Sequence, residues 1–391
     1  MGVNMSANFP RPAPDAIAHS QQFLQYITDS LHNKKELSFE NWMDTVLYSP
    51  GWGYYTGGLA KLSGTNTPTE KLIGDFTTAP ELSHWYGRTL AKQVEQVLAA
   101  SDSQCILEFG AGSGKLAFDM LETLNNSTIN YFILELSADL KQRQQQTLAK
   151  FSNQVKWLDQ LPPSFSGCII ANEVMDAMPV KLLEWNAQGD LQEVFISLDD
   201  VSNIHYVLHP ASNELQQLFS QRMPTLSGYR TEINLRAESW IKELGRCLNK
   251  GGILLIDYGF PRQEYYHPQR HQGTLMCHLQ HHAHSNPLIY PGLQDITAHI
   301  DFTAMADAAL EGNLEVLGYT SQARFLMNCG ILQQLSQLNP DDVHHYAKEI
   351  GPVQKLLSEA EMGELFKVML LGKQLDIDPI GFSYADRRYT L

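Results

Sequence analysis

Short apolar runs alternate with segments of helical spacing through the middle of the chain. The runs occupy residues 105–107, 131–136, 155–158, 168–171 and 253–256. After the first run, Leu116, Met120, Leu121 and Leu124 recur at the spacing of one helix face. Buried strands that alternate with amphipathic helices are typical of an open sheet covered by helices. The pattern therefore predicts a doubly wound α/β fold.

The flanking segments have different patterns. Residues 14–47 have helical periodicity, residues 182–185 and 191–197 read as a β-hairpin, and residues 260–310 lose periodicity. Strands are expected again at 314–317 and 366–371. We predict four regions: a helical and loop region at 1–100, a core at 101–259, an insertion at 260–310 and a completion of the core at 311–391.

The first apolar run ends in a glycine-rich turn with the pattern E-x-G-x-G-x-G, from Glu108 to Gly114. The dinucleotide-binding fingerprint requires glycine at position 115, which is Lys115 here. The phosphate-binding loop requires glycine at position 109 and Ser or Thr at position 116, and the chain has Phe109 and Leu116 there. The remaining pattern looks like the first motif of S-adenosylmethionine-dependent methyltransferases. On this reading Glu108 helps to hold an ammonium group, directly or through water. A tight turn without a ligand is the alternative.

A second acid supports a nucleoside ligand. Glu135 closes the next apolar run, about 20 residues after Gly114, where a doubly wound fold places the carboxylate for the ribose hydroxyls. The alternative is a solvated cap at the end of a strand. We expect the cofactor site to include further residues of the glycine turn and of the strand ends, namely Gly110, Ala111, Gly112, Leu136, Trp157, Leu158 and Asn172.

The fourth run leads into Asn172-Glu173, followed by Asp176. Ligands of open α/β sheets bind beyond the carboxyl ends of strands, so these acids can share a pocket with the glycine turn. Two carboxylates suit a guanidinium, which is always protonated and matches them bidentately. We predict that Glu173 and Asp176 align such an acceptor, although Asp176 could equally cap a turn.

Histidines are concentrated between residues 267 and 299. His278 and His282 would share one face of a helix at the spacing of metal ligands, but the segment reads as a loop, and we expect no metal site. His299 differs because Asp295 and Asp301 flank it. It could therefore act as a proton acceptor or an orienting group.

Composition narrows the class of protein. The chain has 391 residues, of which 43% are hydrophobic, and its net charge of −15 argues against nucleic-acid binding. No apolar run is long enough to span a membrane, and five scattered cysteines indicate reduced thiols. With no secretion signal or Arg-rich presequence, these features predict a cytoplasmic location.

In these motifs the chain resembles the MidA family of methyltransferases, whose mitochondrial members are arginine methyltransferases that assist assembly of respiratory complex I. Further motifs carry the resemblance: G-Y-Y (53–55), G-D-F-T-T-A-P-E-L-S (74–83), A-N-E-V-M-D-A-M-P-V (171–180), I-D-Y-G-F (256–260), G-T-L (273–275) and P-G-L-Q-D-I-T-A-H-I-D-F (291–302). It implies a seven-strand, Rossmann-like class I core whose N-terminal segment and insertion serve the substrate side. It also implies that the three glycines and Glu135 meet S-adenosyl-L-methionine, with Asn172 and Glu173 beside the acceptor.

Two functional hypotheses follow. The first is methyl transfer to an arginine side chain of a protein substrate. The second is a cofactor-binding assembly factor or interaction module that turns over weakly or not at all. A nicotinamide oxidoreductase is disfavoured because Lys115 breaks the dinucleotide fingerprint.

Overall fold

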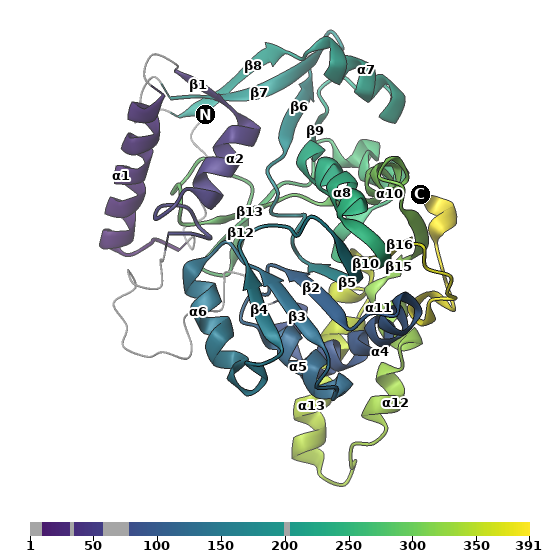
Figure 1. Ribbon diagram of the computed structural model, residues 1–391. Coiled ribbons are helices and arrows are strands. Elements are labelled where there is room, and N and C mark those ends of the chain that lie inside the picture. Colours follow the sequence, from purple (N-terminus) through teal and green to yellow (C-terminus); the bar gives the residue numbers. More distant parts are fainter. Residues whose placement is uncertain (1–9, 32–34, 58–77, 199–203) are drawn as a thin grey trace. The chain divides into compact units, whose positions relative to one another are not determined.

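The computed structural model describes residues 10–31, 35–57, 78–198 and 204–391 (Figure 1). The chain divides into two compact units, each assembled from segments that are far apart in sequence. The first combines Met1–Thr77, Ala177–Arg236 and Tyr266–Ala298, and the second combines Thr78–Asp176, Ala237–Tyr265 and His299–Leu391. All residues that the sequence assigns to a site belong to the second unit.

An eight-stranded sheet forms the centre of the second unit. Its strands follow the order β15-β16-β10-β5-β2-β3-β4, and β14 pairs with β10 beside this path. The strands from β10 to β4 are parallel, whereas β16 is antiparallel to both of its neighbours. The bounds are β2 Cys105–Phe109, β3 Asn130–Leu134, β4 Val155–Leu158, β5 Phe165–Asn172, β10 Leu248–Phe260, β14 Ile300–Asp301, β15 Glu315–Ser321 and β16 Phe366–Lys373.

The predicted strands are all present, but the sheet has one strand more than the seven expected. The additional strand is β14, where Ile300 pairs with Gly259 and Asp301 with Phe260 at the end of β10. A pair of residues is too short to display a period-two pattern, so its pairing depends on distant contacts.

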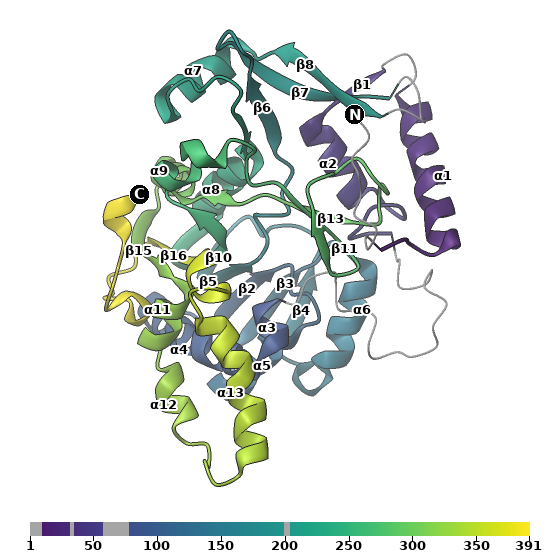
Figure 2. The same ribbon diagram turned by 180° about the vertical axis from the view of Figure 1, so that it is seen from behind.

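Helices of the second unit surround this sheet. The Ser83 side chain caps α4 by accepting a hydrogen bond from the Trp85 amide. Helix α13 packs beside α3 (Figure 2). The helices are α3 Ala79–Leu82, α4 His84–Ser101, α5 Lys115–Leu124, α6 Ala138–Thr147, η2 Ala149–Phe151, α8 Leu235–Cys247 (entering from the first unit), α9 Arg262–Tyr265, α10 Phe302–Glu311, α11 Gln322–Asn328, α12 Ile331–Leu335, α13 Val343–Leu357, α14 Met362–Leu365, η4 Ile380–Phe382 and η5 Arg388–Thr390. In the part of the chain that the structure describes, no helix is long and apolar enough to cross a bilayer.

The first unit contains two antiparallel sheets. The larger follows the order β1-β7-β6-β9 with β8 beside β7, which confirms the predicted hairpin at β6 and β7, and the smaller follows β12-β11-β13. A buried apolar cluster joins α1, α2 and the strands through residues such as Phe23, Trp42 and Val194. The bounds are α1 Pro14–Ser30, β1 Glu36–Ser38, α2 Phe39–Tyr48, β6 Lys181–Trp185, β7 Leu191–Ser197, β8 His205–Pro210, α7 Asn213–Arg222, β9 Arg230–Ile233, η3 Pro268–Arg270, β11 Met276–Leu279, β12 His282–His284 and β13 Asp295–Thr297.

Two local expectations in this unit need correction. The helical pattern at 14–47 is interrupted by β1, because Glu36–Ser38 pairs with β7 and the Ser38 side chain then caps α2. The histidine-rich segment, which the sequence predicts to be a loop, forms a hairpin of β11 and β12, in which His278 pairs with Ala283. His278 and His282 therefore do not share a helix face.

Two glycines lie opposite each other where β5 pairs with β10. Gly167 pairs with Gly251, and both have the positive φ that side chains rarely adopt, at +134° and +142°. A Cβ on Gly251 would lie 1.9 Å from the carbonyl oxygen of Gly167. A side chain at Gly251 would therefore push β10 away from β5. A Cβ on Gly167 would instead lie 2.1 Å from the Cys105 carbonyl oxygen, so a side chain there would separate β5 from β2.

We predict that Gly251→Ala destabilises the protein by about 3 kcal/mol or more, because the methyl group overlaps the β5 backbone. Gly351→Ala is the matched control. Position 351 lies inside α13 with no atom of the described residues within 4 Å of a Cβ, so alanine should add about 0.5–1 kcal/mol of stability. Urea unfolding measures both changes, and equal unfolding midpoints for the two variants would contradict this account.

Candidate functional site

The glycine-rich turn connects β2 to α5. Gly110, Gly112 and Gly114 have φ values of +61°, +54° and +84°, a left-handed conformation that favours glycine. A Cβ on Gly112 would meet no atom of the described residues within 4 Å. At Gly112 the turn therefore presents backbone that the described side chains leave uncovered, which is what a ligand in close contact requires.

Glu135 follows β3 and lies next to this turn. One carboxylate oxygen accepts from the Ser137 amide at 2.9 Å, and the other accepts from the Gln144 side chain at 2.8 Å. Burial raises the pKa of Glu135, although both hydrogen bonds act in the opposite direction. A carboxylate has about four lone-pair positions, so it can still accept from two hydroxyl groups. This acceptor set fits a vicinal diol.

Apolar and aromatic side chains flank Glu135. Leu136 is 75% exposed, and Trp157 and Leu158 lie half-buried at the end of the neighbouring strand β4. The indole N–H of Trp157 donates to the Gln144 carbonyl oxygen at 2.9 Å. Exposed apolar surface beside a diol acceptor fits the base of a nucleoside.

Glu108 is 2% exposed and lies inside the sheet. The Tyr131 hydroxyl donates to its carboxyl oxygen at 2.8 Å, so the two side chains link β2 to β3. Burial raises the pKa of Glu108 to about 7, while the Tyr131 hydrogen bond opposes the shift. The structure therefore places this predicted cofactor residue against Tyr131.

The turn after β5 has an unusual backbone conformation. Glu173 has a φ of +54°, which is strained for a residue other than glycine and often occurs at functional sites. Its carboxylate accepts from the Asn172 side chain at 3.0 Å and from the Ala79 amide at 3.4 Å. The Tyr86 hydroxyl donates to the other end of the Asn172 amide at 2.6 Å. This chain of hydrogen bonds fixes the Glu173 carboxylate.

A buried acid from β10 supports the same turn. One carboxylate oxygen of Asp257 accepts from the backbone amides of Met175 and Asp176, at 3.0 and 3.2 Å. Burial raises the pKa of Asp257. Asp176 is itself 5% exposed. Asp257 thereby holds the backbone that follows the strained residue Glu173.

The glycine turn and the Glu173 turn are neighbours. A Cβ on Gly110 would lie 3.5 Å from the Val174 side chain, which directly follows Glu173. The short helix α3 touches both turns, because Ser113 donates to Glu81 and the Ala79 amide donates to Glu173. Thus the glycine turn and Glu173 meet at the carboxyl ends of β2 and β5. The motif residues 74–77 that precede α3 lie outside the described part of the chain.

His299 lies at the end of β10. Its ring stacks on Phe260, with centroids 5.5 Å apart, and lies 5.8 Å from the Tyr258 ring. The Lys367 ammonium lies over the same Phe260 ring, 5.6 Å from its centroid. The structure therefore places His299 in an aromatic group beside the strand that carries Asp257.

Three residues of this arrangement were missed by sequence reasoning: Tyr86, Gln144 and Asp257. Tyr86 and Gln144 occupy ordinary helical positions, and only their partners reveal them. Asp257 did carry a signal, because it is an acid at the end of a buried apolar run, as Glu108 and Glu135 are.

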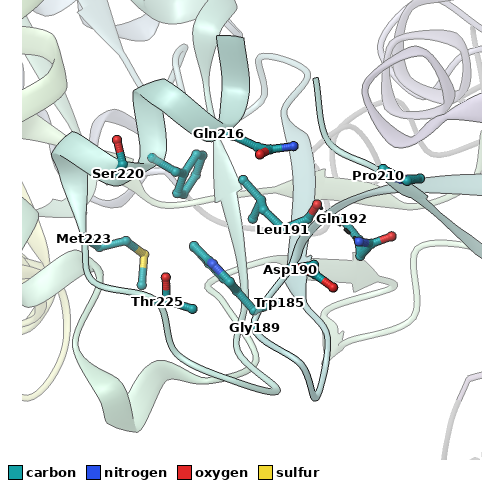
Figure 3. Close-up of a pocket in the computed structure, with 11 residues that line it drawn as sticks. Trp185, Gly189, Asp190, Leu191, Gln192, Pro210, Gln216, Ser220, Met223 and Thr225 are labelled. Atoms are coloured by element: carbon teal, nitrogen blue, oxygen red, sulfur yellow. Dashed lines mark hydrogen bonds between the residues drawn. The ribbon is translucent and has the colours of Figure 1, made fainter. Parts of the chain in front are cut away.

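A separate cavity of about 410 Å³ lies in the first unit (Figure 3). Trp185, Phe219 and Met223 form part of its wall, with Gln192 and Gln216 on the polar side. The β6–β7 hairpin, α7 and the residue that follows α7, Met223, supply these residues. The cavity contains none of the residues that the sequence assigns to a site.

Comparisons with known proteins show the family to which the chain belongs. Residues 87–320 match the family described as "Putative S-adenosyl-L-methionine-dependent methyltransferase". A Burkholderia thailandensis protein, crystallised with S-adenosyl-homocysteine, is 41% identical, with a TM-score of 0.90 over 98% of this chain and 100% of its own. The mouse protein arginine methyltransferase NDUFAF7, mitochondrial, is 28% identical over 89% of this chain and 84% of its own length. Its human counterpart is 27% identical over 92% of this chain and 85% of its own length.

The mouse and human relatives contradict the predicted cytoplasmic location, because their names place them in mitochondria. The prediction rested on reduced thiols and on the lack of a recognisable secretion signal or Arg-rich presequence, and the five cysteines are indeed free. Free thiols indicate that a compartment is not oxidising, but they do not distinguish one reducing compartment from another. The inference from cysteine usage was therefore too specific.

We predict that stability falls between pH 4.5 and about 7 because of Glu108. In this range the folded protein keeps a proton on Glu108 that the unfolded chain releases, so rising pH favours unfolding. Glu108→Gln cannot ionise and should gain about 2–3 kcal/mol relative to the native protein across this range. Urea unfolding at several pH values measures the difference, and a difference independent of pH would refute the raised pKa.

Proposed function

Because the chain belongs to this family of S-adenosylmethionine-dependent methyltransferases, we propose that it methylates an arginine side chain of a protein. The observation that carries the proposal is the fixed carboxylate of Glu173 beside the glycine turn. The names of the mouse and human relatives, which are protein arginine methyltransferases, support the same acceptor. The alternative is a weakly active assembly factor that binds the same cofactor.

The proposed cofactor site uses groups that suit each part of S-adenosylmethionine. Glu135 accepts from the ribose hydroxyls, and Leu136, Trp157 and Leu158 cover the adenine. The backbone of residues 110–114, including Ala111, lies against the methionine portion, with Glu108 and Asn172 near its polar end. When bound, the cofactor supplies an electrophilic methyl group on its sulfonium. The uncovered backbone at Gly112 supports this assignment.

The proposed acceptor site binds a cation. A guanidinium has a pKa above about 12 and stays protonated, so it needs a carboxylate partner. Glu173 holds this group in position, with Asp176 contributing negative charge. The nitrogen that gains a methyl group must give up one proton, and the carboxylate of Glu173 or the imidazole of His299 can accept it. Positioning and electrostatics then provide most of the rate.

We infer further that the seven strands of the main path form a doubly wound class I core and that β14 is an addition to it. The N-terminal region at 1–100 and the insertion at 260–310 would then contribute to substrate recognition, as the family resemblance implies. Binding of nucleic acid is not expected, because the net charge of −15 opposes contact with phosphates.

We predict that Glu173→Gln lowers methyl transfer about 100-fold and changes the affinity for S-adenosylhomocysteine less than about 2-fold. Glutamine keeps the size of the side chain and its acceptor oxygen but removes the charge that holds the guanidinium. The assay follows labelled methyl groups from S-adenosylmethionine into lysate proteins, with methylarginine identified after hydrolysis. Glu95→Gln on α4, 63% exposed, is the matched control and should be unchanged. Label in another residue type would reject arginine as the acceptor, and undiminished transfer would reject the role of Glu173.

We also predict that Gly112→Val abolishes binding of S-adenosylhomocysteine, lowering its affinity at least 100-fold in calorimetry. The branched side chain would occupy the space beside the turn. Gly228→Val is the matched control, because Gly228 has a φ of +71°, and a Cβ there also meets no described atom within 4 Å. Both variants carry similar backbone strain, so only the first should lose binding. Equal affinities would show that the turn does not contact the cofactor.

A further inference from the structure

Helix α6 has an unusual distribution of polar residues. Its sequence is ADLKQRQQQT, and Gln144 is its one buried residue, with an exposed fraction of 0%. The adjacent Gln145 and Gln146 are exposed. Glutamine is seldom the residue through which a helix packs, because a buried amide needs hydrogen-bond partners. Specific hydrogen bonds therefore determine the position of α6 beside β4 (Figure 1).

The Gln144 amide connects three parts of the proposed cofactor site. Its nitrogen donates to the Gly112 carbonyl oxygen at 3.0 Å and to the Glu135 carboxylate at 2.8 Å. Its oxygen accepts from the Trp157 indole at 2.9 Å. The partners fix the orientation of the amide, because the carbonyl and carboxylate only accept and the indole only donates.

Other side chains at this position would leave partners unsatisfied. Leucine offers neither a donor nor an acceptor, and ionised glutamate offers no donor and adds charge next to Glu135. The backbone also fits closely, because a Cβ on Gly114 would lie 3.3 Å from the Gln144 Cα. The glycine turn and α6 are thus packed so that a primary amide can reach all three groups.

We infer that Gln144 is a positioning residue that holds the Glu135 carboxylate and the Trp157 ring ready for the ribose and adenine of the cofactor. The inference rests on the placement of the nucleoside proposed above. Gln144 itself need not touch the cofactor. It sets the orientation of the groups that do, and it ties them to the backbone of the glycine turn. Selectivity for a ribose with both hydroxyls should therefore depend on Gln144.

The test compares Gln144→Leu with Gln145→Leu, the same change on the exposed side of the same helix. Calorimetry measures affinity for S-adenosylhomocysteine and for its 2′-deoxy analogue. We expect Gln144→Leu to lower the affinity for S-adenosylhomocysteine at least 10-fold. The affinity for the 2′-deoxy analogue should fall less than about 3-fold, because the analogue already lacks one hydroxyl contact. Gln145→Leu should match the native protein for both. A loss that is equal for the two ligands would indicate a merely structural role and overturn the inference.

A second readout uses the protein without ligand. The ¹⁵N-labelled indole resonance of Trp157, identified by its loss in Trp157→Phe, should shift in Gln144→Leu and stay in place in Gln145→Leu. An unchanged resonance would contradict the Trp157 contact.

If Gln144→Leu does not fold, Gln144→Glu keeps the size of the side chain. Its affinity for S-adenosylhomocysteine should rise as pH falls from 8 to 6, because the protonated acid regains a donor and loses its charge beside Glu135. A flat response equal to that of the native protein would also overturn the inference. If Gly112→Val retains binding, the proposed placement of the cofactor at the glycine turn fails first, which separates the two proposals.

Discussion

The parallel pairing of β2, β5 and β10 is the constraint on which the site depends. In this register Phe109 pairs with Ala171, and Asn172 pairs with Ile256. The residues that follow each strand therefore emerge at one edge of the sheet. Buried apolar runs keep the strands together, and Gly251 allows β10 to approach β5 closely. If this register changed, the glycine turn, the Glu173 turn and Asp257 would no longer be neighbours.

At that edge, buried polar groups hold one another in defined orientations. Tyr86 orients Asn172, Asn172 orients Glu173, and Asp257 holds the backbone amides of the turn that follows. Burial raises the pKa of Tyr86 far above its usual value, with the charges of Glu173 and Asp257 adding to the effect, so the phenol remains a donor. Such networks are costly when incomplete and restrictive when satisfied. The strained conformation of Glu173 is therefore maintained by its surroundings.

The two halves of the proposed site are supported by different means. On the acceptor side, α3 links Ser113 to Glu81 and the Ala79 amide to Glu173, so it connects the two turns directly. On the nucleoside side, Gln144 joins Gly112, Glu135 and Trp157 through one amide. Both supports attach to the glycine turn. The turn is thus the element that both halves of the proposed site share.

By itself, the sequence determined the buried strands, the glycine turn, the acids at strand ends and the family, because apolar runs and turn residues act over a few neighbouring positions. Only the tertiary structure decided the roles of Tyr86, Gln144 and Asp257, whose partners lie on other strands and helices. It also decided that β14 and β1 form, because each is a strand only through its pairing with a strand that is distant in sequence. The physical reason is the same in each case: these hydrogen bonds join residues that are separate along the chain, and local periodicity carries no information about them.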